Sequence, residues 1–123
     1  MKSLSPNIFV NNINETIDFY KILGFTTIMT VPEEGDFIWV MMKHEEVTIM
    51  FQTFESLAND LPEINRTKGG SLLFYIIVAD VNSYFEKIYK KVSVLKGLEK
   101  TFYGATEFSI LDNNGYVLTF AEQ

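Results

Sequence analysis

The sequence contains no cysteine and a single histidine, His44, among its 123 residues. Without cysteine there are no disulfides, no thiolate metal sites and no cysteine nucleophiles. One histidine also excludes most histidine-rich metal sites. His44 lies in the charged turn Lys43–Glu46, where we expect a solvated side chain.

Basic residues and long apolar runs are also scarce. Ten Lys and Arg against 16 Asp and Glu give a net charge of −6, and no basic run exceeds Lys90-Lys91, so a nucleic-acid partner is not expected. No apolar run reaches the roughly 20 residues that span a bilayer, and the N-terminus lacks the apolar region of a signal peptide. We therefore expect a cytoplasmic protein with no membrane partner.

Hydrophobic and aromatic residues are plentiful. They include 11 Phe, 6 Tyr and 1 Trp, and 47% of the chain is hydrophobic, which excludes disorder and a coiled coil. A chain of this length is typical of one globular domain, here residues 1–123.

The most informative pattern is an internal duplication. Residues 10–14 (VNNIN) recur 68 residues later as residues 78–82 (VADVN), each time after a β-rich run and before a helical pattern. If the second repeat has one extra residue before this point, Trp39 aligns with Phe108 and Met50 aligns with Thr119. The chain therefore reads as module one at 4–53, a linker at 54–70 and module two at 71–123.

Each module reads as β-α-β-β-β. In the first, Asn12 precedes a helical stripe with Glu15 three residues on, an arrangement that caps a helix, and Gly24 is suited to end that helix. In the second, Asp80 takes the capping position. The expected strands are residues 7–10, 25–31, 37–42 and 47–53, then 72–78, 92–95, 103–111 and 116–122.

Alternation along the paired strands predicts which side chains share a face. A two-residue turn at His44-Glu45 places Phe37, Trp39, Met41, Met50 and Gln52 on one mixed face. A turn at residues 112–115 places Phe108 with Thr119, and puts Glu107 on the helix-facing side. Such faces either enclose a ligand pocket or pack on each other as core.

The duplicated plan, the segment 17–25 (IDFYKILGF) and the closing segment 104–116 (GATEFSILDNNGY) together resemble the vicinal oxygen chelate superfamily. Its members include glyoxalase I, extradiol dioxygenases and bleomycin-resistance proteins. The resemblance implies an α+β fold of two tandem βαβββ modules, whose curved mixed sheets surround a cleft, usually in a homodimer.

The metal-dependent members place one His or Glu ligand on the first and last strand of each module. The resemblance puts these positions at Ser5, Met50, Leu73 and Thr119. Thioether, aliphatic and hydroxyl side chains are not usual ligands of a divalent ion. We therefore expect no metal and no other cofactor, and we place the chain in the bleomycin-resistance-like branch.

The function that we predict is metal-independent binding or sequestration of a small, aromatic or cationic molecule in the cleft. One alternative is an enzyme with an atypical site, either a glyoxalase-like lyase or isomerase or a dioxygenase-type enzyme. The other is an interaction module that mainly dimerises. No catalytic residue is assigned, and Glu107 is the candidate for an acid, a base or an ion-pair partner. The predicted ligand contacts are Phe37, Trp39, Met41, Met50, Gln52, Tyr75, Phe108 and Thr119.

Overall fold

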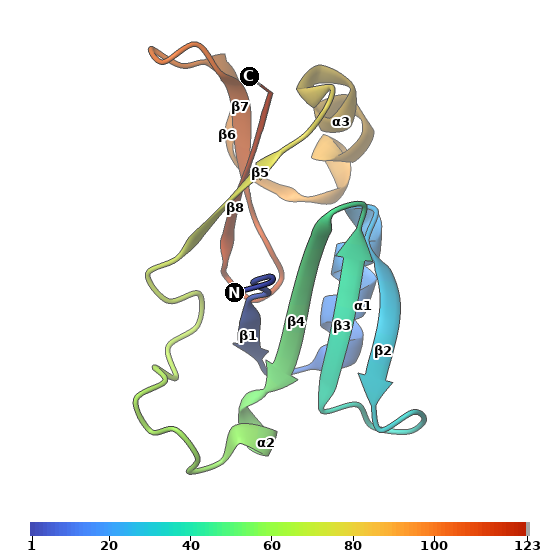
Figure 1. The fold of residues 1–123 in the computed structure, drawn as a ribbon. Helices are drawn as coiled ribbons and strands as arrows, with labels where there is room; N and C mark the ends of the chain where they lie inside the picture. The colour runs from blue at the N-terminus through green and yellow to red at the C-terminus, as the bar shows by residue number, and fades with distance from the viewer. Residues whose placement is uncertain (123) are drawn as a thin grey trace. The chain divides into compact units, whose positions relative to one another are not determined.

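The computed structural model describes residues 1–122 and divides the chain into two compact units, Met1–Thr67 and Lys68–Gln123 (Figure 1). The first unit contains β1 (Asn7–Val10), α1 (Ile13–Ile22), β2 (Thr26–Val31), β3 (Trp39–His44), β4 (Val47–Thr53) and the short α2 (Phe54–Leu57). The second contains β5 (Leu73–Ile77), α3 (Val81–Ile88), the 3-10 turn η1 (Tyr89–Lys91), β6 (Ser93–Lys100), β7 (Thr106–Leu111) and β8 (Val117–Glu122). The predicted α+β class and the repeated β-α-β-β-β order are confirmed. No helix within residues 1–122 is both long and apolar enough to cross a membrane.

The two main helices begin where their capping residues predict. Asn12 Oδ1 accepts the backbone N–H of Glu15 at 2.9 Å, and Asp80 Oδ1 accepts that of Ser83 at 3.0 Å. These bonds satisfy amides that have no partner inside the helix. Gly24 follows α1 with a φ of +102°, a left-handed conformation that glycine adopts without strain.

The first unit forms sheet A, with strand order β1-β4-β3-β2 and a parallel β1–β4 pair. Helix α1 lies along one face of this sheet (Figure 1). Val40, Met42, Ile49 and Phe51 are buried on that side, where the Tyr20 ring of α1 lies 4.7 Å from the Phe51 ring. The opposite face, here the open face of sheet A, carries alternate residues of the same strands: Asn7, Phe9, Met29, Val31, Trp39, Met41, Met50 and Gln52.

The β3–β4 turn differs from the prediction by one position. His44 pairs with Val47, so the turn residues are Glu45-Glu46, and Trp39 lies opposite Gln52 rather than Met50. This register shift is two residues, so the predicted shared face of Trp39 and Gln52 is retained. His44 is half-buried, and its ring lies 5.7 Å from that of Phe25, rather than projecting freely into solvent.

The second unit forms sheet B, with strand order β5-β8-β7-β6 and a parallel β5–β8 pair. Helix α3 packs on one face, where Phe108, Ile110, Leu118 and Phe120 are buried. The Phe108 ring lies 5.0 Å from Phe85 of α3 and 5.2 Å from Phe120. The other face is the open face of sheet B.

In sheet B the predicted faces of β7 were wrong. Leu111 pairs with Val117, which leaves five residues, 112–116, in the connection instead of four. A one-residue change of register moves every side chain of a strand to the other face. Phe108 therefore belongs to the core beneath α3, and Glu107 lies on the open face beside Ala121.

Candidate functional site

The open face of sheet A brings four of the predicted contact residues together. Met41 and Met50 are paired across β3 and β4, and Trp39 and Gln52 form the next pair. All four are half-buried, in contrast to the fully buried residues on the α1 side. Met29 and Val31 of the edge strand extend this surface, and both are exposed. The result is an apolar surface that contains the only tryptophan of the chain.

A short polar chain borders this surface. Asn7 Nδ2 donates to Gln52 Oε1 at 3.0 Å, and Gln52 Nε2 donates to Ser56 Oγ at 3.1 Å. Within residues 1–122, Asn7 Oδ1 is buried without a hydrogen-bond partner. A buried unpaired acceptor costs free energy, and this one lies at the border of the apolar surface.

Phe37 does not join the open face as predicted. It lies before β3, in the β2–β3 connection, because the register pairs Gln52 with Trp39. There it lines a separate hollow of about 530 Å³ near the start of α1. The other residues that line it are mostly polar: Asn11, Asn12, Ile13, Asn14, Asp36, Ile38, Thr53, Glu55 and Ser56.

The open face of sheet B is graded in chemistry from one end of its strands to the other. Its residues form three rows across β5, β8, β7 and β6: Leu73, Val117, Leu111 and Ser93; then Tyr75, Thr119, Ser109 and Lys96; then Ile77, Ala121, Glu107 and Glu99. The first row is mostly apolar, the second carries hydroxyls and an amine, and the third ends in two carboxylates. Thr119 and Ser109 share a hydrogen bond of 2.7 Å.

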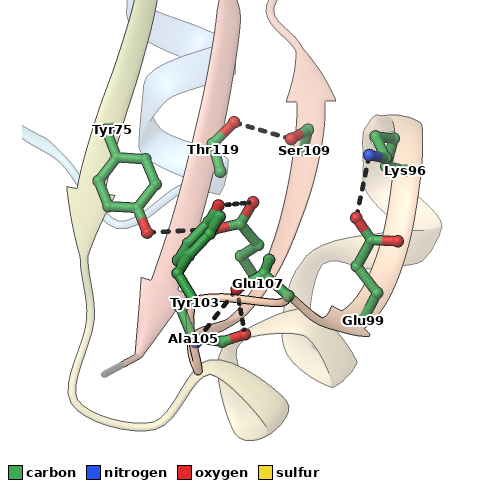
Figure 2. A network of polar contacts seen from close by, with 9 residues as sticks. Tyr75, Lys96, Glu99, Tyr103, Ala105, Glu107, Ser109 and Thr119 are labelled. Atoms are coloured by element: carbon green, nitrogen blue, oxygen red, sulfur yellow. Dashed lines mark hydrogen bonds and ion pairs between the residues drawn. The ribbon is translucent and has the colours of Figure 1, made fainter.

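Two tyrosines converge on Glu107 (Figure 2). The Tyr75 hydroxyl donates to Glu107 Oε2 at 3.1 Å, and the Tyr103 hydroxyl lies 2.9 Å from both carboxylate oxygens. Tyr75 belongs to β5, so its side chain reaches across β8 to meet a residue of β7. The small side chain of Ala121, directly between Ile77 and Glu107, leaves room for this reach.

Tyr103 is held in place by the β6–β7 connection. Thr101 and Ala105 close this turn through three hydrogen bonds. Ala105 O accepts the Thr101 N–H at 2.8 Å and the Thr101 hydroxyl at 3.1 Å, and the Ala105 N–H donates to Thr101 Oγ1 at 3.1 Å. Between them Phe102 is fully exposed, and Tyr103 folds back over the sheet toward Glu107 (Figure 2).

The Tyr103–Glu107 contact should be visible by titration. The hydrogen bond to Glu107 raises the pKa of Tyr103, because ionisation would remove the donated proton and place a phenolate beside a carboxylate. This contact therefore stabilises the fold below the ordinary tyrosine pKa of about 10, and the contribution is lost as the pH rises through the raised value. In Glu107→Gln we expect the Tyr103 pKa to fall, as measured by NMR on isotope-labelled tyrosine. Glu86→Gln on α3 makes the same charge change and should leave it unaltered; equal pKa values in both variants would contradict the contact.

The residues at the four positions where related enzymes coordinate a metal are not suited to bind a divalent ion. Met50 and Thr119 lie on the open faces of β4 and β8, Leu73 begins β5, and Ser5 precedes β1. A thioether, an aliphatic chain and hydroxyls offer no strong charged or imidazole ligand. Within residues 1–122 no group of three His, Asp or Glu side chains is placed to hold a metal.

Part of this arrangement was predictable from the alternation of residues along the strands. Trp39, Met41, Met50 and Gln52 share one surface, and Tyr75 and Thr119 share another with Glu107, whereas Phe37 and Phe108 lie elsewhere. Ser109, Lys96 and Glu99 are not among the predicted contact residues. Ser109 follows Glu107 by two residues in one strand, so the correct face assignment would have found it.

Comparisons with known proteins agree with this fold. A family model of the Glyoxalase/Bleomycin resistance protein/Dioxygenase superfamily matches residues 3–120. No curated protein matches the chain.

Several solved structures share the fold at low sequence identity. A protein of unknown function from Agrobacterium tumefaciens str. C58 is 23% identical, with a TM-score of 0.80 over 100% of this chain and 94% of that one. A glyoxalase/bleomycin resistance protein/dioxygenase family enzyme from Burkholderia phytofirmans PsJN is 21% identical, with a TM-score of 0.77 over 96% and 95%. A bleomycin-binding protein solved in complex with bleomycin is 15% identical, with a TM-score of 0.71 over 100% and 99%. With the family model matching nearly its whole length, the chain belongs to the glyoxalase/bleomycin resistance protein/dioxygenase superfamily.

Proposed function

We propose that this protein binds a small organic molecule, aromatic or cationic, through apolar and aromatic contacts and without a metal ion. The observation that carries the proposal is the open face of sheet A, where Trp39, Met41 and Met50 are half-buried instead of closed into the core. The contact residues that we propose are Trp39, Met41, Met50 and Gln52 on sheet A and, on the separate surface of sheet B, Tyr75 and Thr119.

The side chains of this face suit such a ligand. Methionine thioethers are flexible and polarisable, so they adapt to irregular shapes, and an indole ring stacks on aromatic groups and attracts cations. Burying apolar surface contributes roughly 25 cal/mol per Å². The chain of amides from Asn7 to Gln52 adds polar groups that would orient the ligand at the border.

The absence of a suitable donor set supports binding without coordination. None of Ser5, Met50, Leu73 and Thr119 carries a carboxylate or an imidazole. Affinity is therefore expected to be independent of added chelator. The structural similarity to a bleomycin-binding protein supports a small-molecule ligand. That the chain forms a homodimer, and that its sheets surround a cleft, stay predictions.

Trp39 provides the test, because it is the only tryptophan. Bleomycin and the neutral aromatic phenethyl alcohol would each be titrated into the chain in the presence of chelator, with tryptophan fluorescence as the readout. We expect a saturable change for at least one of them. Met50→Lys places a charge on the apolar face and should weaken binding about tenfold, which corresponds to about 1.4 kcal/mol.

Ile22→Lys is the matched control, because Ile22 is partly exposed at the end of α1, on the helix side of sheet A. Circular dichroism and thermal melting would show whether both variants fold. If the two lysine variants bound the probe equally well, the ligand would not bind on the open face of sheet A. A complete lack of saturable change with either probe, or binding that is lost on adding chelator, would refute metal-free binding.

A further inference from the structure

Glu107 is a half-buried carboxylate whose charge is not balanced by a neighbouring base. In the described part of the chain, no Lys or Arg nitrogen lies within 4 Å of it, and the nearby Lys96 pairs instead with Glu99 at 3.0 Å. The hydrogen bonds that Glu107 accepts come from phenols, which are neutral at physiological pH. Glu107 therefore accepts hydrogen bonds on the open face of sheet B but has no basic partner there.

The charged groups around Glu107 also sum to a net negative charge of one. Glu99 and Glu107 are direct partners across β6 and β7, an arrangement in which like charges repel. Lys96 lies in the neighbouring row, and its hydrogen bond and attraction to Glu99 raise its pKa, with a smaller contribution from Glu107. Two carboxylates and one ammonium leave a net charge of −1, which a single monovalent cation would balance.

The groups around Glu107 are those that recognise an organic cation. Tyr75 and Tyr103 are 43% and 54% exposed, so aromatic surface is available to a positive group beside the carboxylate. Leu73 and Ile77, which flank Tyr75 on the same face of β5, are exposed as well. An inorganic cation gains nothing from such apolar neighbours, whereas an amine with a hydrocarbon or aromatic body does.

We infer that Glu107, framed by Tyr75 and Tyr103, is the binding site for the positively charged group of an organic amine, amidine or guanidine. The N–H donors of the ligand would bind the carboxylate lone pairs that the two phenols leave available, while its apolar body lies on Leu73 and Ile77. This inference rests on the proposed function, since it names the charged class within the ligands proposed above.

The test compares two probes that differ in charge and little in shape. Phenethylamine and phenethyl alcohol would be titrated into the chain, and binding would be followed by NMR shifts of the isotope-labelled Tyr75 and Tyr103 rings. We expect the amine to bind more tightly than the alcohol, and its affinity to fall with added salt. In Glu107→Gln the amine should lose about three- to tenfold in affinity, while the alcohol is unaffected.

Glu86→Gln on α3 is the matched control, because it makes the same change in net charge away from the open face. It should leave the affinity for the amine unchanged. If Glu107→Gln and Glu86→Gln weaken amine binding equally, the effect is one of overall charge and the site at Glu107 is refuted.

The outcomes separate this inference from the proposed function. If both probes bind equally well and Glu107→Gln has no effect, the cation site is refuted and small-molecule binding stands. If neither probe shifts any tyrosine resonance of sheet B, the cation site is refuted, and the fluorescence titration at Trp39 still decides the proposed function separately.

Discussion

Phe108→Ala is expected to lower the free energy of unfolding by about 3–5 kcal/mol. The Phe108 side chain is 1% exposed and lies against the rings of Phe85, Tyr84 and Phe120, so its removal leaves a cavity beneath α3. Urea denaturation followed by circular dichroism would measure the loss.

Tyr75→Ala is the control, since Tyr75 lies on the open face of the same sheet and is 43% exposed. Its removal should cost much less, about 1 kcal/mol or below, since surface substitutions have small effects. If the two variants were equally stable, the assignment of Phe108 to the core and of Tyr75 to the open face would be wrong.

Asp112→Ala is expected to cost about 2–4 kcal/mol, the second largest effect that we predict. Asp112 is buried, and its Oδ1 accepts the backbone N–H groups of Asn114 and Tyr116, both at 2.8 Å. Without this oxygen two buried donors lose their partner. Chemical denaturation would give the loss, and hydrogen exchange at Asn114 and Tyr116 would show whether it arises in the turn.

Asp112→Asn keeps an acceptor oxygen at the same position and should retain most of the stability. It therefore separates the loss of hydrogen bonds from a general intolerance of change at this residue. Rapid exchange at Asn114 and Tyr116 in Asp112→Asn, or unchanged exchange in Asp112→Ala, would contradict the role given to this carboxylate.

The elements of this fold were predictable because their signals are local. The capping residues Asn12 and Asp80 begin both helices as expected, and the duplication of residues 10–14 at 78–82 predicts two similar units. The buried face of sheet A also follows from alternation along β3 and β4, because the error in the predicted pairing of these strands was two residues, an even number.

The open face of sheet B was not predictable in this way. Its assignment depended on the length of one turn, and Asp112-Asn113-Asn114-Gly115 suggests four residues. Tyr116 also belongs to the turn, because its backbone N–H donates a hydrogen bond to the side chain of Asp112. The spacing of residues does not reveal this bond. The convergence of Tyr75 and Tyr103 on Glu107 joins three strand and turn segments, so it depends on that same register.

The extra residue of the second turn also changes how the two halves of the chain correspond. When the cross-strand pairs of the two sheets are aligned, the pair Trp39–Gln52 of sheet A corresponds to the pair Glu107–Ala121 of sheet B. The pair Met41–Met50 corresponds to Ser109–Thr119. Equivalent points of a repeated backbone thus hold an indole in one half and a carboxylate in the other. A protein built from two copies of the first half would have an indole at both points and no carboxylate there, so the two open faces differ in their side chains while the order of their strands is the same.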